Sequence, residues 1–324
     1  MAAILAADIG ATNSRFGHFS VDAGELKLEA TTWLKTASVT SFAELMQKLE
    51  DSGFGLAPDK ADATTIAIAG AVEQDLRARP VNISWDIDLT HADRQFGMRR
   101  VGLINDFVAQ AYACRTAAVS EAKRILEGRP DLTAALGVIG AGTGLGKCAL
   151  VPIPNQARFI ALPSEGGHSD FPFIGAEEFE FQRFACQVMG REQIIGDIVV
   201  SGPGLSLTHR FLTGQDLTPA QVAATFAQEG ADSPTLHWAA RFYGRACRNY
   251  ALEILARAGI YIAGGVAAKT PAIVLHPEFA TAFRTSETHG SLLADIPVLL
   301  NDNQESGLWG AAFHAHQQLR GVSC

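Results

Sequence analysis

Residues 5–16 read LAADIGATNSRF, an apolar run that passes directly into a turn of small and polar residues. The apolar run is typical of a buried strand. In the turn, backbone N–H groups and the Thr12 hydroxyl can bind phosphate oxygens, while the Asp8 carboxylate can hold a magnesium ion through water. The segment therefore predicts a site for a magnesium-bound triphosphate.

The overall composition limits the classes of partner. The chain has 324 residues, a net charge of −8, 48% hydrophobic residues and 19% charged residues. This length fits two domains of ordinary size. The negative charge argues against nucleic acid as the main partner, because binding a phosphate backbone requires clusters of Lys and Arg. A single nucleotide such as ATP can be bound by backbone N–H groups and a metal ion, so it stays compatible with the charge.

Cysteine usage and hydropathy indicate the cellular compartment. The five cysteines lie far apart and form no C-x-x-C pair, so neither a zinc site nor a disulfide framework is indicated. They are Cys114, Cys148, Cys186, Cys247 and Cys324. The N-terminus lacks the basic segment of a signal peptide, and no uncharged apolar stretch is long enough to cross a membrane. We expect a soluble, cytoplasmic protein with no membrane contact.

Alternating strand-like and helix-like segments predict an α/β fold. In the N-terminal third, we expect strands over 3–8, 14–20, 26–35, 64–70 and 99–105, and helices over 41–51 and 106–116. A second unit is expected from near Gly137, with strands over 138–139, 148–152 and 261–263 and helices over 177–190, 205–212, 233–259 and 307–320. Both units contain a strand-turn-strand with a Gly/Thr tip, which indicates weak internal duplication.

Residues 140–147, GAGTGLGK, come close to two nucleotide-binding motifs and match neither. A dinucleotide fingerprint needs a glycine in place of Leu145, and a P-loop needs Ser or Thr in place of Cys148. The β-type residues on both sides predict a hairpin instead. Its tip can bind phosphate through N–H groups and the Thr143 hydroxyl, or it can be a tight turn whose glycines supply positive φ. Four glycines within seven residues exceed what a turn requires, which favours phosphate binding.

Further segments complete an ordered pattern: INDF at 104–107, EGGHSDF at 165–171, SGPGL at 201–205 and IAGGV at 262–266. Together with the two glycine-rich turns, they make the chain resemble the bacterial glucokinase family, within the actin-like group of sugar kinases and ATPases. The resemblance covers nearly the whole chain.

The resemblance implies two actin-like α/β domains flanking a cleft, with a final helix that returns to the N-terminal domain. We expect residues 1–110 with 305–324 to form a small domain, and residues 111–304 a large one. ATP and Mg²⁺ are the implied cofactors, glucose or a related hexose is the implied partner, and a homodimer is the implied assembly.

The resemblance also implies roles for single residues. Asp106 is the implied catalytic base, which accepts the proton of the attacking sugar hydroxyl. From spacing alone, Asp106 is equally well explained as the N-cap of the helix that follows it. The implied sugar-binding residues are Asn105, Asp106, Glu165, His168, Asp197 and Asn82. Asn82 is explained equally well as a turn-forming residue.

The implied nucleotide-binding residues are small or polar and lie at the turns. They are Asp8, Gly10, Ala11, Thr12 and Asn13 in the first phosphate loop, Gly142, Thr143 and Gly144 in the second, and Gly264 and Gly265 beside adenosine. Asp8 is also the implied magnesium ligand. Any strand that ends in two glycines would show the same pattern as Gly264 and Gly265.

Three residues and one turn depart from the family pattern. Asp197 stands where the family carries a Glu, and this shorter side chain could shift the preference among hexoses. Ala11 and Ser164 each replace a glycine, so their backbones must avoid strongly strained φ. The turn at 70–72 lacks the family's proline. These departures leave phosphoryl transfer supported and make "hexose" a safer prediction than "glucose".

We therefore expect an ATP-dependent glucokinase that makes glucose 6-phosphate. One alternative is a kinase for mannose, fructose or an N-acetylated amino sugar. Alternatives of another class are a non-catalytic sugar sensor and a sugar-independent ATPase.

Overall fold

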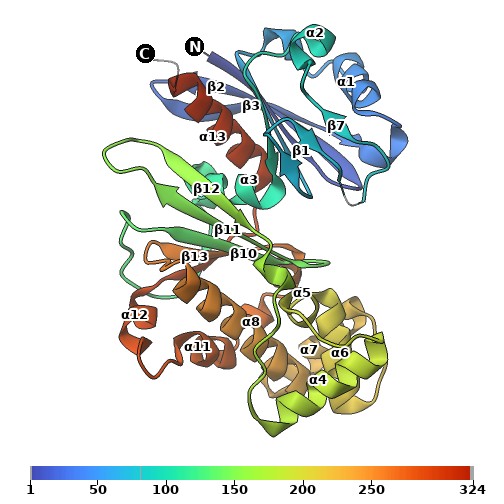
Figure 1. Cartoon of the computed structure of the whole chain (residues 1–324), viewed down its shortest axis with the longest axis vertical. Coiled ribbons are helices and arrows are strands. Elements are labelled where there is room, and N and C mark those ends of the chain that lie inside the picture. Colours follow the sequence, from blue (N-terminus) through green and yellow to red (C-terminus); the bar gives the residue numbers. More distant parts are fainter. Residues whose placement is uncertain (1, 81, 322–324) are drawn as a thin grey trace. The chain divides into compact units, whose positions relative to one another are not determined.

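The computed structural model describes residues 2–80 and 82–321, so Cys324 lies outside the described residues (Figure 1). The chain divides into two compact units, residues 1–121 with 303–324 and residues 122–302. The boundaries expected from the sequence, 110/111 and 304/305, lie nearby in the chain.

The first unit contains a five-stranded sheet in the order β3-β2-β1-β4-β8. Its strands are β1 (Ala2–Ile9), β2 (Asn13–Asp22), β3 (Glu25–Lys35), β4 (Ala63–Ile68) and β8 (Val101–Asn105). Its helices are α1 (Phe42–Asp51), α2 (Ala92–Phe96), α3 (Asp106–Ala113) and α13 (Ser306–Arg320). Three two-residue strands, β5 (Val72–Glu73), β6 (Arg77–Ala78) and β7 (Ile87–Asp88), form a separate small sheet that the sequence did not predict.

The second unit contains a six-stranded sheet in the order β12-β11-β10-β13-β14-β9. Its strands are β9 (Lys123–Leu126), β10 (Leu136–Ala141), β11 (Leu145–Pro152), β12 (Phe159–Ser164), β13 (Gly259–Ala263) and β14 (Val298–Leu300). Its helices are α4 (Gly175–Met189), α5 (Gly196–Val199), α6 (Gly202–Thr213), α7 (Pro219–Glu229), α8 (Pro234–Glu253), α9 (Gly265–Lys269), α10 (Ala272–Leu275), α11 (Pro277–Arg284) and α12 (Gly290–Asp295).

The two sheets repeat one topological pattern. In the first unit, β1 pairs antiparallel with β2 and parallel with β4, and β4 pairs parallel with β8. In the second, β10 pairs antiparallel with β11 and parallel with β13, and β13 pairs parallel with β14. The α/β fold class is confirmed, and the duplication indicated by the two glycine-rich turns extends to the order and direction of the strands around them.

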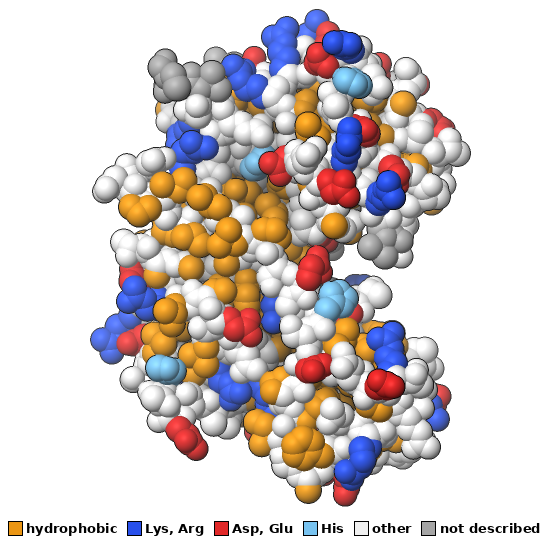
Figure 2. All heavy atoms as spheres, in the orientation of Figure 1, with side chains coloured by type: hydrophobic (Ala, Val, Ile, Leu, Met, Phe, Trp, Pro, Cys, Tyr) orange, Lys and Arg blue, Asp and Glu red, His pale blue; other side chains and the backbone are white. Residues whose placement is uncertain are grey.

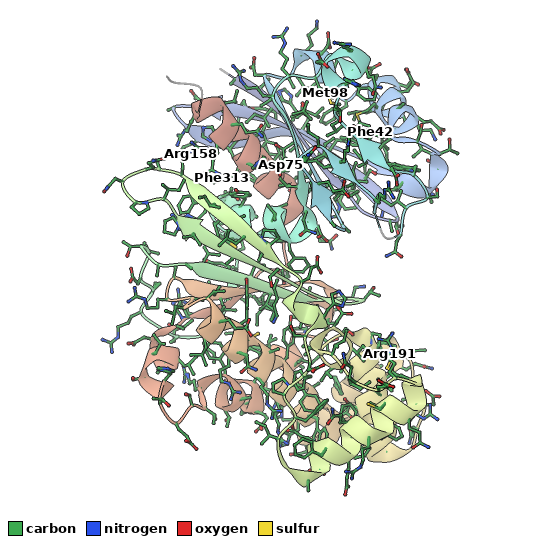
Figure 3. The ribbon with its side chains drawn as sticks, viewed as in Figure 1. Phe42, Asp75, Met98, Arg158, Arg191 and Phe313 are labelled. Carbon is green, nitrogen blue, oxygen red and sulfur yellow. The ribbon has the colours of Figure 1, made fainter. Side chains whose placement is uncertain are left out.

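Buried side chains on the predicted elements form the cores. In the first unit, Leu45 of α1 and Ile66 of β4 are fully buried, and Phe42 and Met98 belong to the same apolar cluster (Figure 3). In the second, aromatic rings of α4, α6 and α8 pack edge to face around Phe181. Such ring geometry adds to the free energy gained from burial.

Two predicted helices end earlier than expected. The helix expected over 233–259 ends at Glu253, because Leu255 has a φ of +49° and the chain enters β13 at Gly259. The helix expected over 106–116 ends at Ala113, because the Thr116 hydroxyl accepts a hydrogen bond from the Ala118 N–H and starts a separate turn. The first helix therefore ends because of a positive φ, and the second because of a local side-chain cap.

Among the described cysteines, Cys148, Cys186 and Cys247 are free thiols. Over residues 2–80 and 82–321, no helix combines the length and the apolar composition needed to cross a membrane. On the face shown in Figure 2, Lys and Arg side chains lie among Asp and Glu side chains over both units.

Helix α13 completes the first unit from the other end of the chain. It packs against β1, β4 and α3, and the Trp309 ring meets Phe19 of β2 edge to face at 5.1 Å. The contact with α3 is so close that a Cβ atom on Gly310 would overlap the carbonyl oxygen of Ala109. Glycine is therefore required at the crossing of the two helices.

Gly310→Ala should destabilise the protein, because α13 and α3 must move apart to admit the methyl group. Overpacking of this kind costs about 1–3 kcal/mol in the free energy of unfolding. Urea unfolding followed by circular dichroism measures the loss. Gly290→Ala is the matched control, since a Cβ atom there meets nothing within 4 Å at the start of α12. Equal stability of the two variants would contradict the close crossing.

Candidate functional site

The carboxyl ends of the parallel strands bring two acidic residues to one edge of the first sheet. Ile9, Ile68 and Asn105 are the last residues of β1, β4 and β8, and the pairing places Ile9 opposite Ile68 and Ile68 opposite Asn105. Asp8 lies one residue before this row and Asp106 one residue after it. Ligands of open α/β sheets bind at such an edge.

The first glycine-rich turn connects β1 to β2 beside these carboxylates. The Gly10 N–H donates to the Asn13 carbonyl oxygen at 3.0 Å, and the Thr36 hydroxyl donates to the Gly10 carbonyl oxygen at 2.7 Å. Ala11 and Thr12 at its tip are exposed. The turn is held from behind by Thr36 and offers its tip to a ligand.

Asp8 lies among groups that restrain its carboxylate. The Arg15 guanidinium approaches Asp8 Oδ2 at 3.4 Å, stacks 4.3 Å from the centre of the Trp33 ring and donates to the Gln304 carbonyl oxygen at 2.6 Å. A Cβ atom on Gly307, in the first turn of α13, would lie 2.5 Å from Asp8 Oδ2. The carboxylate therefore meets backbone at a helix N-terminus, where the peptide dipoles favour negative charge.

Burial perturbs both carboxylates, and the charge of Asp8 adds to the perturbation of Asp106. The pKa of Asp106 is raised from 3.8 to about 6. Burial is the larger cause of this shift, and the negative charge of Asp8 is the second. Burial also raises the pKa of Asp8, against the opposing charge of Arg15. Carboxylates with shifted pKa values that interact electrostatically at a sheet edge are typical of functional sites.

The helix that carries Asp106 is capped by its neighbour. The side chain of Asn105 occupies the N-cap position and accepts a hydrogen bond from the Phe107 N–H at 2.8 Å, while its amide donates to the Gly70 carbonyl oxygen at 3.0 Å. The interpretation of Asp106 as the N-cap is therefore wrong, because the helix starts at Asp106 itself. Its Oδ1 also accepts from the Phe107 N–H, at 3.0 Å, which fixes the carboxylate at the helix start.

The other sugar-binding position expected in this unit, Asn82, is exposed and lies in a turn. Neither of its two explanations, sugar ligand or turn former, is tested by this placement.

The second glycine-rich turn is the predicted hairpin, formed by β10 and β11 with residues 142–144 at its tip. None of its glycines has a positive φ, so the interpretation that glycine supplies positive φ here is wrong. Gly142 donates its N–H to the Gly144 carbonyl oxygen at 2.8 Å, and a Cβ atom on it would meet nothing within 4 Å. Thr143 is exposed, so the tip is open to a ligand.

Glu165 and His168 lie on a single helical turn that follows β12. Their side chains are 80% and 62% exposed, and His168 Nε2 lies 3.7 Å from Glu165 Oε2. Two exposed polar groups this close can contact one ligand, as the sequence predicted. Among the described residues, no group of three or more His, Cys, Asp or Glu side chains could hold a metal ion.

Asp197, expected beside the sugar, contacts the hairpin. Its Oδ1 accepts a hydrogen bond from the Leu145 N–H at 2.5 Å, directly after the hairpin tip.

The glycine pair after β13 has two different reasons for being glycine. Gly264 has a φ of +86°, and a Cβ atom on it would lie 2.6 Å from the Ala141 carbonyl oxygen, so packing alone requires it. Gly265 starts α9, and a Cβ atom there would meet nothing closer than 4.0 Å. Open space for a ligand exists at Gly265.

The departures from the family pattern are accommodated by the backbone. Neither Ala11 nor Ser164 has a positive φ, so each side chain is tolerated where the family has glycine.

Sequence analysis missed two basic residues. Arg15 lies within the opening motif, and a cation next to a phosphate loop was a signal that could have identified it. Lys147 is 8% exposed and donates to the Gly166 carbonyl oxygen at 3.3 Å, which joins β11 to the Glu165–His168 turn. Because Lys147 lies in a segment that resembles a P-loop without matching it, the sequence did not indicate this role.

Comparison with known proteins shows the family and the fold. A family model described as Glucokinase matches residues 5–318. The glucokinase of Chromobacterium violaceum is 32% identical, over 97% of this chain and 90% of its own.

Two solved structures show the same fold. A glucokinase from an Antarctic psychrotroph gives a TM-score of 0.86 at 24% identity, over 98% of this chain and 99% of its own. A ROK family glucokinase from Streptomyces griseus, solved with glucose and AMPPNP, gives 0.57 at 19% identity, over 97% and 99%. The actin-like α/β fold class and the resemblance drawn from the motifs are confirmed.

The raised pKa of Asp106 predicts a pH-dependent stability change in Asp106→Asn. A carboxyl group with a pKa of about 6 when folded and 3.8 otherwise binds its proton more tightly in the folded state. Its protonation therefore favours folding fully below pH 3.8, and this contribution is lost as the pH rises through 6. At pH 8 the neutral amide should increase the free energy of unfolding by about 1–3 kcal/mol relative to the wild type.

Urea unfolding at pH 4, 6 and 8 measures this difference, which should shrink as the pH falls. Asp93→Asn is the control, because Asp93 is an exposed aspartate in the first turn of α2. If the difference in free energy of unfolding between Asp106→Asn and the wild type did not change with pH, the burial of the Asp106 charge would be contradicted.

Proposed function

The chain belongs to the glucokinase family, and we propose that it transfers the γ-phosphoryl group of ATP to the 6-hydroxyl of glucose with Asp106 as general base. The observation that carries the assignment of the base is the carboxylate at the start of α3, held by the Phe107 N–H and perturbed by burial. A pKa of about 6 leaves it ionised at neutral pH and still basic enough to accept the hydroxyl proton.

We assign sugar recognition to polar side chains that have hydrogen-bonding capacity left. Glu165 and His168 are exposed and adjacent, and Asn105 keeps one amide N–H beyond the contacts that fix its orientation. Groups arranged for several hydroxyls discriminate against analogues that lack one, because the protein's own polar atoms then stay unpaired. Asn82 stays a prediction as a sugar ligand, while the Asp197 carboxylate accepts the Leu145 N–H.

We assign the phosphates to the two glycine-rich turns, with Gly10 to Asn13 in one unit and Gly142 to Gly144 in the other. Both tips expose backbone and a Thr hydroxyl, the donors that phosphate oxygens accept from. Adenosine is assigned to Gly265, where space is open.

Asp8 is the residue we propose to hold Mg²⁺. Magnesium in kinase sites is bound by one or two carboxylates together with substrate phosphates, which suits the two mutually repelling carboxylates of this edge. When bound, the ion would neutralise charge on the phosphates. A homodimer and a cytoplasmic location stay predictions from the family resemblance.

Asp106→Ala should lower kcat by at least about 100-fold, the usual contribution of a general base, while glucose binding is retained. A coupled assay with ATP, magnesium and glucose measures kcat, and fluorescence titration measures the glucose Kd. Asp93→Ala serves as the control with normal turnover. In the wild type, kcat/KM should fall as the pH drops through about 6, since Asp106 then becomes protonated. Near-normal turnover of Asp106→Ala would remove the residue from its role.

The same assay run on a panel of hexoses tests the substrate. We expect the highest kcat/KM with glucose. A higher value with mannose, fructose or an N-acetylated amino sugar would assign that sugar instead, and ATP hydrolysis that no sugar changes would assign an ATPase.

Asp8→Asn should raise the magnesium concentration needed for half-maximal velocity, because the amide is a weaker ligand for a hard cation than a carboxylate. A magnesium titration at fixed ATP measures this shift, and Asp93→Asn provides the control. An unchanged magnesium requirement would mean that Asp8 does not hold the ion.

A further inference from the structure

Asp197 stands where the family carries a Glu, and its carboxylate is engaged by the phosphate hairpin. Its Oδ1 accepts the N–H of Leu145 at 2.5 Å. A Cβ atom on Gly144 would overlap this oxygen, so the carboxylate lies directly against the hairpin tip. Helix α5, which carries Asp197, also packs on β11 (Figure 1).

The same short helix is tied to the segment that carries Glu165 and His168. The Gly196 N–H donates to the Ser169 carbonyl oxygen at 3.0 Å, and Asp170 forms a bridge with Ile195. A Cβ atom on Gly167 would overlap the carbonyl oxygen of Leu145, so this segment and the hairpin are in direct backbone contact.

We propose that Asp197 is a positioning residue, which fixes the phosphate hairpin against the segment assigned to the sugar. This inference rests on the proposed function and gives Asp197 a role in nucleotide binding that differs from sugar recognition. The N–H groups of residues 142–145 would then be ordered before the nucleotide binds.

The local contacts explain why a charged acceptor is needed here. Besides its contact with Asp197, the tip is held by two backbone hydrogen bonds: the Gly142 N–H donates to the Gly144 carbonyl oxygen at 2.8 Å, and the Gly202 N–H donates to the Gly142 carbonyl oxygen at 3.1 Å. Flexible glycine backbone loses more entropy on ordering than other residues do. Hydrogen bonds to an ionised acceptor are stronger than neutral ones, so a carboxylate offsets more of that entropy.

The test compares Asp197→Ala with Asp197→Asn and with the control Asp232→Ala, whose aspartate is exposed on a turn of the same unit. Asp197→Ala should lower kcat/KM for ATP by roughly tenfold or more, the factor expected for a lost hydrogen bond to a charged group. Its glucose Kd, titrated without nucleotide, should stay at the wild-type value. Asp197→Asn should recover only part of the activity, because the amide oxygen can still accept from the Leu145 N–H but forms a weaker hydrogen bond than the carboxylate.

Hydrogen exchange of the peptide spanning residues 141–150 gives a readout that needs no substrate. Exchange should be faster in Asp197→Ala than in the wild type and the control. A tenfold rise in the glucose Kd of Asp197→Ala, or unchanged exchange and unchanged ATP kinetics, would overturn the proposal. If the wild type phosphorylates no hexose, the proposed function fails, while exchange and AMPPNP titration still test whether Asp197 orders the hairpin.

Discussion

The site in the first unit depends on two carboxylates that burial and proximity prevent from behaving independently. Asp8 and Asp106 flank the row in which three parallel strands end, and both pKa values are raised. Their positions follow from backbone pairing, from the cap formed by Asn105, and from the first turn of α13 against Asp8. A helix from the far end of the chain is therefore part of the geometry of the first turn, and the close crossing at Gly310 is what allows it.

Glycine serves two opposite purposes around the proposed phosphate sites. At Gly307, Gly310 and Gly264, a side chain would collide with backbone or with a carboxylate, so glycine permits close packing. At Gly142 and Gly265, a side chain would meet nothing nearby, so packing does not require glycine. At these two positions the backbone is open, and both belong to segments that the family motifs assign to nucleotide.

Local patterns in the sequence predicted the strands β1, β2, β10 and β11 and the hairpin at residues 142–144, because periodicity and glycine content act over a few residues. Local patterns failed where the role of a residue depends on its exact position at a helix start or on a contact with a residue distant in the chain. Asn105 rather than Asp106 caps α3, a shift of one position that spacing does not resolve. Asp197 meets Leu145 across 52 positions in the chain, and Lys147 turns toward Gly166. Only tertiary structure reveals such contacts.

The charge of the protein explains why the two proposed phosphate loops differ in character. A sheet edge with two carboxylates repels the phosphates of a nucleotide, and the whole chain carries a net charge of −8. In the proposed function, attraction would come from a bound cation and from neutral N–H donors whose dipoles are fixed in advance. The hairpin of the second unit presents such neutral donors, and its one adjacent carboxylate is engaged by a backbone N–H. In the proposed function, an acidic protein would bind a polyanion in this way because its carboxylates would hold the cation and its backbone N–H groups would bind the phosphates.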